Sequence, residues 1–309
     1  MLHTNQKVVI LLGTFNGAEF LPAQLESFCD QSHPNWELWV SDDGSTDRTI
    51  EIVEAFAKRV PQKVSLRQGP GKAFWKNFLS IVQLNDIDGE FFAYSDQDDV
   101  WLPEKLTKAV DWLVTIPNER PAVYFTRTAL IRRDGTPLGF SPLFTRACSF
   151  QNALVQNVGG GNTMVFNRAT KSVLAAIPPD IALISHDWST YQMVTGVGGI
   201  AHYDPWPSTK YRQHGQNLVG SNSGLLERIR RLRSLVEGRF TLWNDTNIEA
   251  LSRMRRLLSP ESLATLDRFA RARTSMLPRR LYLLWKSGVY RQSVLESVGL
   301  FGGAFLGRI

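Results

Sequence analysis

A cluster of carboxylates carries the clearest chemistry of this sequence. Asp96, Asp98 and Asp99 directly follow the apolar run 91–94, which is typical of a buried strand. Open α/β sheets bind ligands at the carboxyl ends of their strands, and carboxylates this close raise one another's pKa unless a cation lies among them. A hard divalent ion, Mg²⁺ or Mn²⁺, removes that repulsion and can bridge to phosphate oxygens. The alternative, a solvated acidic loop, leaves the apolar run and residues 101–103 (Trp-Leu-Pro) unexplained.

A second acidic pair, Asp42 and Asp43, also follows a strand-like run, 36–40. A carboxylate at a strand end can accept hydrogen bonds from a base N–H or from ribose hydroxyls. An ordinary turn with a helix cap is an equally open interpretation, because residues 44–47 (Gly-Ser-Thr-Asp) include good capping residues. The loop 13–17 also lies between a strand and a helix, but neither a G-x-G-x-x-G fingerprint nor a P-loop is present. A dinucleotide-binding Rossmann domain is therefore not expected.

Three consecutive glycines, Gly159, Gly160 and Gly161, precede Asn162. Because glycine lacks the Cβ that blocks close approach, we expect this segment to bring its backbone near a bound ligand. A tight turn is the alternative.

The elements that must position these groups alternate along the chain. Up to about residue 115, β-rich runs and helical patterns alternate, which is typical of βαβ units around a mostly parallel sheet. The patterns predict strands at 8–12, 36–40, 63–66 and 91–94, and helices at 20–28, 46–59, 71–84 and 103–114. Further on they predict a hairpin from 122, a strand at 162–166, helices at 169–176 and 186–194, and an extended run at 200–211.

Composition narrows the class of protein. The 309 residues are 43% hydrophobic, enough for one substantial core and an appendage. The two cysteines, Cys29 and Cys148, lie far apart, so neither a disulfide framework nor a zinc site is expected, which fits a reducing cytosol. The apolar stretch 8–12 is too short for a signal peptide, and no run reaches the roughly 18 residues that span a bilayer. A soluble or peripheral protein is predicted.

The net charge of +6 is distributed unevenly. Residues 225–309 hold 16 Lys and Arg against 7 Asp and Glu, a balance of +9, whereas residues 1–224 hold 19 against 22, a balance of −3. We therefore expect a catalytic domain over 1–224 and a basic helical module over 225–309. Its first helix is marked by an apolar stripe of Leu225, Ile229, Leu232, Leu235 and Val236.

The basic module has two equally weighted interpretations. Its arginines, together with Phe240, Trp243 and the segment 281–285, suit an interfacial helix at an anionic membrane. Alternatively, it is a helical subdomain that packs on the catalytic core or forms a dimer. No nucleic-acid-binding motif accompanies it, so specific nucleic-acid binding is not expected.

Three strings, in this order and spacing, resemble family 2 inverting glycosyltransferases. They are residues 14–17 (Thr-Phe-Asn-Gly), 42–47 (Asp-Asp-Gly-Ser-Thr-Asp) and 95–103 (Ser-Asp-Gln-Asp-Asp-Val-Trp-Leu-Pro). The resemblance covers residues 7 to about 222 and is to the rhamnosyltransferase-like members that decorate bacterial surface polysaccharides. It implies an α/β GT-A fold, a mostly parallel sheet flanked by helices, with the basic C-terminal extension added to it.

The resemblance also implies roles for residues on the donor side. Thr14 and Asp42 would contact the nucleoside, with Asn16 shaping the loop and Asp43 beside them. Asp98 would be a direct metal ligand, Asp96 would stand in the metal and diphosphate site, and Asp99 would support it. The other donor-side candidates are Lys72, Asn77, Arg212, which could neutralise phosphate charge, and His214, which could ligate the metal or hydrogen-bond phosphate.

On the acceptor side, inverting transfer needs a general base to take the proton of the attacking hydroxyl. In the family this is a carboxylate at the start of a helix, commonly the Asp of a Glu-Asp pair. Here His186-Asp187 stands at that place, so Asp187 is the predicted base, although it could simply cap the helix. Gly160, Gly161, Asn162 and Trp188 are predicted to lie near the sugar or the acceptor.

The resemblance favours deoxythymidine diphosphate (dTDP) rhamnose as donor, with uridine diphosphate (UDP) sugars next, and a saccharide or lipid-linked acceptor. The Gln-x-x-Arg-Trp string of processive synthases is absent, so addition of a single sugar is expected. We expect a cytoplasmic enzyme, peripheral on the inner face of the membrane. The rival hypothesis is a non-catalytic sensor that binds a sugar nucleotide, since its donor-site residues would look the same.

Overall fold

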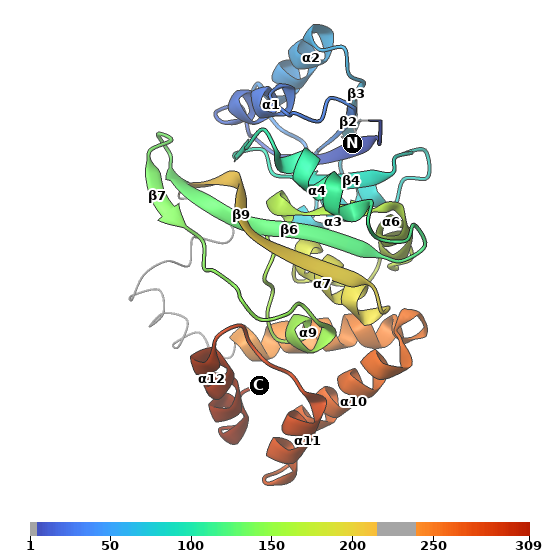
Figure 1. Ribbon diagram of the computed structural model, residues 1–309, viewed down its shortest axis with the longest axis vertical. Coiled ribbons are helices and arrows are strands. Elements are labelled where there is room, and N and C mark those ends of the chain that lie inside the picture. The colour runs from blue at the N-terminus through green and yellow to red at the C-terminus, as the bar shows by residue number, and fades with distance from the viewer. Residues whose placement is uncertain (1–4, 215–238) are drawn as a thin grey trace.

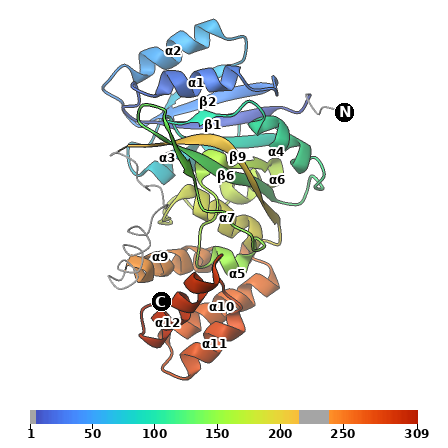
Figure 2. The same ribbon diagram turned by 60° about the vertical axis from the view of Figure 1, so that its left-hand side comes forward.

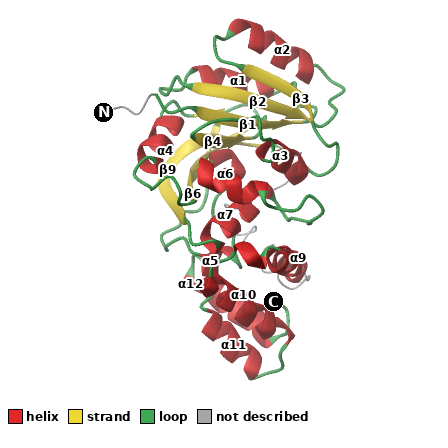
Figure 3. Ribbon diagram, turned by 90° about the vertical axis from the view of Figure 1, so that its right-hand side faces the viewer, coloured by secondary structure: helices red, strands yellow, loops and turns green. Residues whose placement is uncertain are grey.

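The computed structural model describes residues 5–214 and 239–309. An upper part is built around one sheet and a lower part consists of helices (Figures 1 and 3). The predicted α/β class is confirmed.

The first four strands are parallel neighbours. They are β1 (Val8–Thr14), β2 (Trp36–Asp42), β3 (Val64–Gln68) and β4 (Phe91–Ser95), arranged in the order β3-β2-β1-β4. Thr14 pairs with Asp42 and Leu12 with Ser95, so the segments that follow these strands leave the same edge of the sheet. The two acidic clusters of the sequence therefore lie along one edge.

The rest of the sheet is mixed. Beyond β4 lie β8 (Val165–Asn167), β6 (Ala122–Arg132), β9 (Ile200–Gln213) and β5 (Val100–Trp101), and β7 (Pro137–Phe140) forms a hairpin with β6. Strands β6 and β9 run parallel, whereas β5 pairs with β9 in antiparallel fashion. That last pairing brings the loop after β4 next to the end of β9.

Alternating side chains of the strands face two helical layers. Val8, Ile10 and Leu12 of β1 join one hydrophobic cluster, and Val9 and Leu11 join the other. The first cluster includes α1 (Leu21–Cys29), α2 (Thr49–Arg59) and α4 (Lys105–Leu113). The second includes α3 (Phe74–Val82), α5 (Phe150–Ala153), α6 (Arg168–Ala175) and α7 (His186–Gly196).

Three helix starts differ from the prediction by two or three residues. The helix expected from residue 71 begins at Phe74. The helix expected from residue 46 begins at Thr49, because the intervening turn is held by Asp47, whose carboxylate accepts the N–H of Thr49 at 3.0 Å. The helix expected from Pro103 begins at Lys105. The proline lies in the turn before it, where its carbonyl accepts the N–H of Ser32.

The C-terminal helices pack on the sheet domain. They are α9 (Arg239–Arg253), α10 (Pro260–Thr274), α11 (Arg279–Ser287) and α12 (Val294–Phe305), seen below the sheet in Figure 2. Leu251, Met254 and Phe269 share one hydrophobic cluster with Tyr191 of α7, so the helices that carry them are packed against the sheet domain. The predicted stripe at 225–236 and the predicted boundary after residue 224 lie outside the described residues.

In the described ranges, 5–214 and 239–309, the helices are too short or too polar to cross a bilayer.

Candidate active site

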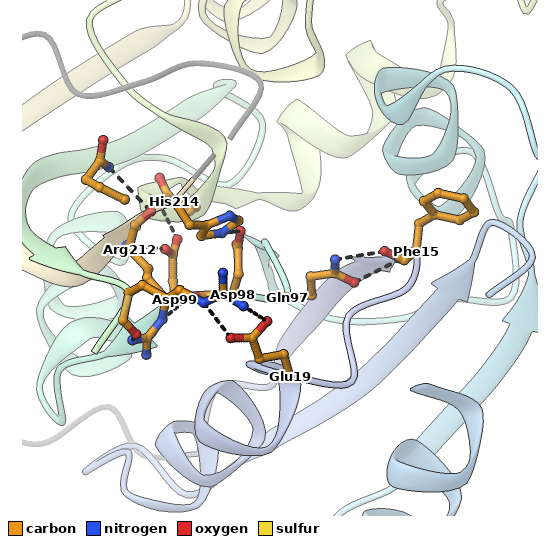
Figure 4. A network of polar contacts seen from close by, with 10 residues as sticks. Phe15, Glu19, Gln97, Asp98, Asp99, Arg212 and His214 are labelled. Atoms are coloured by element: carbon orange, nitrogen blue, oxygen red, sulfur yellow. Dashed lines mark hydrogen bonds and ion pairs between the residues drawn. The ribbon is translucent and has the colours of Figure 1, made fainter. Parts of the chain in front are cut away.

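The acidic cluster lies where three segments meet. Residues 96–99 leave the end of β4, and β5 then pairs with β9, with Val100 opposite Lys210. The carboxylate of Asp98 thereby lies 2.8 Å from the Nε2 of His214 (Figure 4). The sequence-predicted pairing of a distant histidine with this cluster is present.

Asp99 is turned inward and fully buried. One of its oxygens accepts the backbone N–H of Arg212 at 3.0 Å, and the other accepts the side-chain amide of Asn162. Its carboxylate therefore ties together β4, β9 and the glycine-rich segment. This matches the supporting role expected for Asp99 better than direct ligation of an ion.

Arg212 also holds the backbone around the acidic cluster in place. Its Nε donates to the carbonyl of Asp98 at 3.0 Å and its Nη1 to the carbonyl of Arg133 at 2.8 Å, and its guanidinium lies over the Phe20 ring at 4.8 Å. These contacts fix the Asp98 backbone from behind. Its predicted contact with phosphate stays a prediction.

A buried lysine that sequence reasoning missed stands behind the cluster. Lys105 is fully buried, donates to the carbonyl of Asn162, and lies 4.0 Å above the Trp101 ring. Burial lowers its pKa, and the negative charges of Asp99 and Asp96 oppose that shift. The only signal in the sequence was its place two residues after Pro103 in an otherwise amphipathic helix.

The carboxylates next to Lys105, those of Asp96 and Asp99, have raised pKa values. Burial is the main cause for Asp96, and the charges of Asp99, Asp98 and Asp187 add to it. The glycine-rich segment joins the two halves of the predicted site, because Gly161 donates to Asp187 and the next residue, Asn162, donates to Asp99.

The donor atoms present fit a divalent ion that is completed by substrate. In the part of the chain that the structure describes, no three His, Cys, Asp or Glu side chains come together as a ready-made metal cluster. Of the four predicted ligands, Asp98 and His214 are in direct contact, and Asp96 is half-buried in the same loop. Mg²⁺ in particular is commonly held by one or two carboxylates plus phosphate oxygens and waters, so this sparse set is sufficient.

On the nucleoside side, Asp42 organises a turn. It accepts the Thr14 hydroxyl at 2.8 Å and the backbone N–H groups of Gly44 and Ser45 at 3.0 and 2.7 Å. Thr14 and Asp42 are both buried, so a base or ribose would have to share these oxygens. The nucleoside contacts of Thr14 and Asp42 stay a prediction, whereas the turn that the sequence also suggested is present in the structure.

Asn16 shapes the neighbouring loop, as expected. Its φ of 47° is left-handed, a conformation that asparagine tolerates. Its side-chain oxygen accepts the N–H of Thr46 at 2.8 Å, and its own N–H donates to Ser45 Oγ at 2.8 Å. The two sequence strings 14–17 and 42–47 are therefore one interlocked structure.

Asp43 and Asn77 converge beside Gly69. Asp43 accepts the N–H of Gly71 at 3.0 Å, and Asn77 donates to the carbonyl of Ser41 at 2.8 Å. The Asn77 side-chain oxygen is buried without a partner among the described residues, so it can accept a ligand's N–H or hydroxyl. Lys72, by contrast, is exposed in the turn before α3, and its predicted contact with the donor stays a prediction.

The predicted base lies at the start of α7. One oxygen of the Asp187 carboxylate accepts the Asn157 amide at 3.0 Å and the Gly161 N–H at 3.3 Å. Its other oxygen accepts the Trp188 N–H at 2.8 Å, so Asp187 shares the capping of this helix with the Ser185 hydroxyl. Asp187 is half-buried, and its role as the base stays a prediction.

His186, next to the base, is neutral and buried. Its ring stacks on Phe78 with centroids 3.9 Å apart and meets Tyr94 edge-on at 4.8 Å. Burial lowers its pKa to about 4, and neither ring nitrogen has a hydrogen-bond partner among the described residues. A neutral ring in the place where the family commonly has Glu keeps a second negative charge away from Asp187.

The three glycines are explained by packing. A Cβ at Gly159 would meet the Phe125 ring at 2.6 Å, one at Gly160 would meet Asn162 Oδ1 at 2.7 Å, and one at Gly161 would overlap the Nε2 of His186. The close approach expected here is therefore made by the protein itself. Gly160 is exposed, so contact with a sugar from that residue stays a prediction.

A Gly161→Ala substitution is expected to lower turnover at least about tenfold and to cost about 1–3 kcal/mol of stability, as overpacking does. The reason is that the stacked His186 ring cannot retreat, so the strain shifts Asp187. Gly299→Ala in α12 is the control, because a Cβ there meets nothing within 4 Å. Urea unfolding and a sugar-transfer assay measure both effects, and equal behaviour of the two variants would contradict the packing argument.

Trp188 has a different place from the one predicted. Its indole N–H donates to the carbonyl of Ala153 at 2.7 Å, and its ring meets Trp243 of α9 edge-on at 5.9 Å. The side chain is buried on the face of α7 that carries the C-terminal helices. The structure thus places Trp188 in the core instead of beside an acceptor.

Comparison with known proteins covers the same elements. Residues 9–149 match the family model described as Glycosyl transferase family 2, a range that includes both acidic clusters and ends before Asp187. The dTDP-rhamnosyl transferase RfbG of Shigella flexneri is 27% identical over 237 residues, which cover 72% of this chain and 78% of RfbG.

Two solved structures share the fold. The mannosyltransferase PcManGT from Pyrobaculum calidifontis, in complex with GDP-Man and Mn²⁺, superposes with a TM-score of 0.53 at 17% identity, covering 98% of this chain and 87% of that one. S. aureus TarS 1–349, in complex with UDP-GlcNAc, superposes with a TM-score of 0.51 at 17% identity, covering 92% and 93%.

Proposed function

This chain carries a glycosyl transferase family 2 domain on a GT-A fold, and from that premise we propose that it transfers one sugar from a nucleotide diphosphate donor to a hydroxyl, with inversion. The acceptor oxygen attacks the anomeric carbon while the bond from that carbon to the diphosphate oxygen breaks. The hydroxyl proton passes to a carboxylate and the nucleotide diphosphate leaves.

The observation that carries the proposal is the Asp187 carboxylate. It is half-buried, oriented by Asn157 and Gly161, and joined to the acidic cluster through Asn162, which follows Gly161 and donates to Asp99. A base held this way can take a proton from an acceptor hydroxyl as that hydroxyl attacks a donor bound at the cluster.

Asp98 and His214 would hold the divalent ion, Mn²⁺ or Mg²⁺, with Asp96 beside them and Asp99 and Arg212 fixing the loop. Such an ion, when bound, neutralises charge that develops on the departing diphosphate. Thr14, Asn16, Asp42, Asp43, Lys72 and Asn77 complete the donor side of the proposal.

For the substrates, the similarity to RfbG favours a dTDP-sugar, with rhamnose as the sugar and UDP-sugars as the next candidates. The acceptor is proposed to be a saccharide or lipid-linked saccharide of cell-surface polysaccharide synthesis, met at the cytoplasmic face of the membrane.

A thermal-shift panel of nucleotide diphosphates and their sugars, each with Mn²⁺, Mg²⁺ or chelator, tests the donor site. One nucleotide at about 100 times its Kd should stabilise the protein by about 2.7 kcal/mol, only with metal. Asp98→Ala should lose the shift, while Asp88→Ala, which removes an exposed ion pair with Arg168, should keep it. Shifts that are absent for every nucleotide, or unchanged in Asp98→Ala, would overturn the proposed site.

A further inference from the structure

Helix α12 turns its apolar side chains toward solvent. Of its hydrophobic residues, Val294, Leu295, Val298 and Phe305 are 60 to 77% exposed, and Leu306 directly after it is 67% exposed. Residues at spacings of three, four and seven lie on one side of a helix, so these side chains form a continuous surface. We call these five residues the apolar face of α12.

The polar residues of the same helix point the other way. Ser297 Oγ donates to the carbonyl of Arg291 at 3.1 Å, and Glu296 lies 3.7 Å from the Arg291 guanidinium. Leu300 and Ala304 complete the inner side in the core. A helix that faces water shows the opposite arrangement, so this surface is not built for water alone.

The neighbouring helix adds aromatic side chains with basic partners. On α11, which packs against α12, Tyr282 and Trp285 are 57% and 64% exposed. The Lys286 ammonium lies 5.0 Å above the Trp285 ring. Exposed Trp and Tyr beside lysine are typical of the boundary between lipid headgroups and acyl chains.

Charge distinguishes the two candidate partners of this surface, a second copy of the chain and a lipid bilayer. Residues 276–309 contain five Arg and Lys against one acid, a balance of +4, and that acid, Glu296, already pairs with Arg291. Two copies of such a surface repel each other, which disfavours self-association, whereas an anionic bilayer attracts it. Helix α12 lies on the same side of the molecule as the end of β9 (Figures 1 and 2). A bilayer bound at α12 would therefore lie on the side of the molecule that carries the candidate site.

We propose that α12 and the aromatic side chains of α11 dock on the surface of an anionic lipid bilayer. The apolar face of α12 enters the acyl boundary, and Arg279, Lys286 and Arg308 lie among the anionic headgroups. The inference deepens the proposed function by naming the surface that holds the enzyme near a lipid-linked acceptor. It differs from the sequence-based expectation, since Phe240 and Leu284 are buried and the exposed residues come mainly from α12.

Flotation of the full chain with phosphatidylcholine vesicles, with and without about one third phosphatidylglycerol, tests this. We expect at least about tenfold stronger binding to the anionic vesicles. Leu295→Ser with Phe305→Ser should abolish it, and Arg279→Glu with Lys286→Glu should remove the preference for anionic lipid. Leu138→Ser with Phe140→Ser, which replaces two exposed apolar residues on β7, should leave binding unchanged.

Wild-type protein that stays unbound, or a Leu295→Ser/Phe305→Ser variant that floats like wild type, would overturn the inference. A wild-type dimer in lipid-free solution that this variant converts to monomer would assign the face to a second copy instead. The result is independent of the proposed function, because flotation needs no donor. A variant that loses vesicle binding should keep its nucleotide-dependent melting shift, whereas failure of the donor site removes that shift in wild type.

Discussion

Replacing Asp187 with Asn is expected to reduce turnover about 10³-fold while donor binding persists, the loss that removal of a general base typically causes. The amide keeps the shape of the carboxylate and one acceptor for the Asn157 and Gly161 donors, but it cannot take a proton. Single-turnover transfer rates and the metal-dependent melting shift, measured on the same preparation, separate the two effects.

Asp180→Asn is the matched control, because Asp180 is an exposed acid whose partner is Arg253, and it should retain full turnover. Asp187→Asn with wild-type rates would refute the assignment of the base. Wild-type protein that binds a donor yet transfers nothing to any of many acceptors would favour the rival hypothesis of a non-catalytic sensor.

Replacing Lys105 with Met is expected to lower the free energy of unfolding by about 3–5 kcal/mol, since removing the buried ammonium leaves the charge of the neighbouring buried carboxylates uncompensated. Lys105 is the buried cation beside Asp99 and Asp96. Its ammonium also holds the carbonyl of Asn162, whose amide binds Asp99. Urea denaturation of both proteins measures the difference.

Lys108→Met provides the comparison on the same helix. Lys108 is exposed and lies 5.0 Å above the Trp206 ring, so its removal should cost less than about 1 kcal/mol. Equal losses for the two variants would mean that the Lys105 charge does not balance the cluster. Adding Asp99→Asn to Lys105→Met should recover part of the loss if it does.

The fold was predictable to the extent that hydrophobic patterns carry it. Apolar runs such as 8–12 and 91–94 are buried on both sides of a parallel sheet, so they stand out in the sequence. Pairings between distant segments do not leave such a trace. Nothing local indicates that the two-residue strand β5 joins β9, although that pairing is what brings His214 to Asp98.

The site could be predicted from the sequence where neighbouring like charges required a counter-charge. Three carboxylates after a buried strand demand a cation, and that argument led to Asp98 and Asp96. It pointed to a metal ion and overlooked Lys105, because a lysine in an amphipathic helix is ordinarily exposed. The prediction for Trp188 was wrong because successive residues of a helix are rotated by about 100°. Asp187 faces the site, whereas the side chain of Trp188 lies in the core.

The glycine run 159–161 limits how this protein can be redesigned. Each of its residues is held to glycine by a different neighbour, Phe125, Asn162 or His186, so no single compensating change would free the loop. A mutagenesis library aimed at new donors or acceptors should leave the run intact. Its diversity belongs at Phe15, whose side chain is 56% exposed while its backbone is fastened at both ends to Gln97.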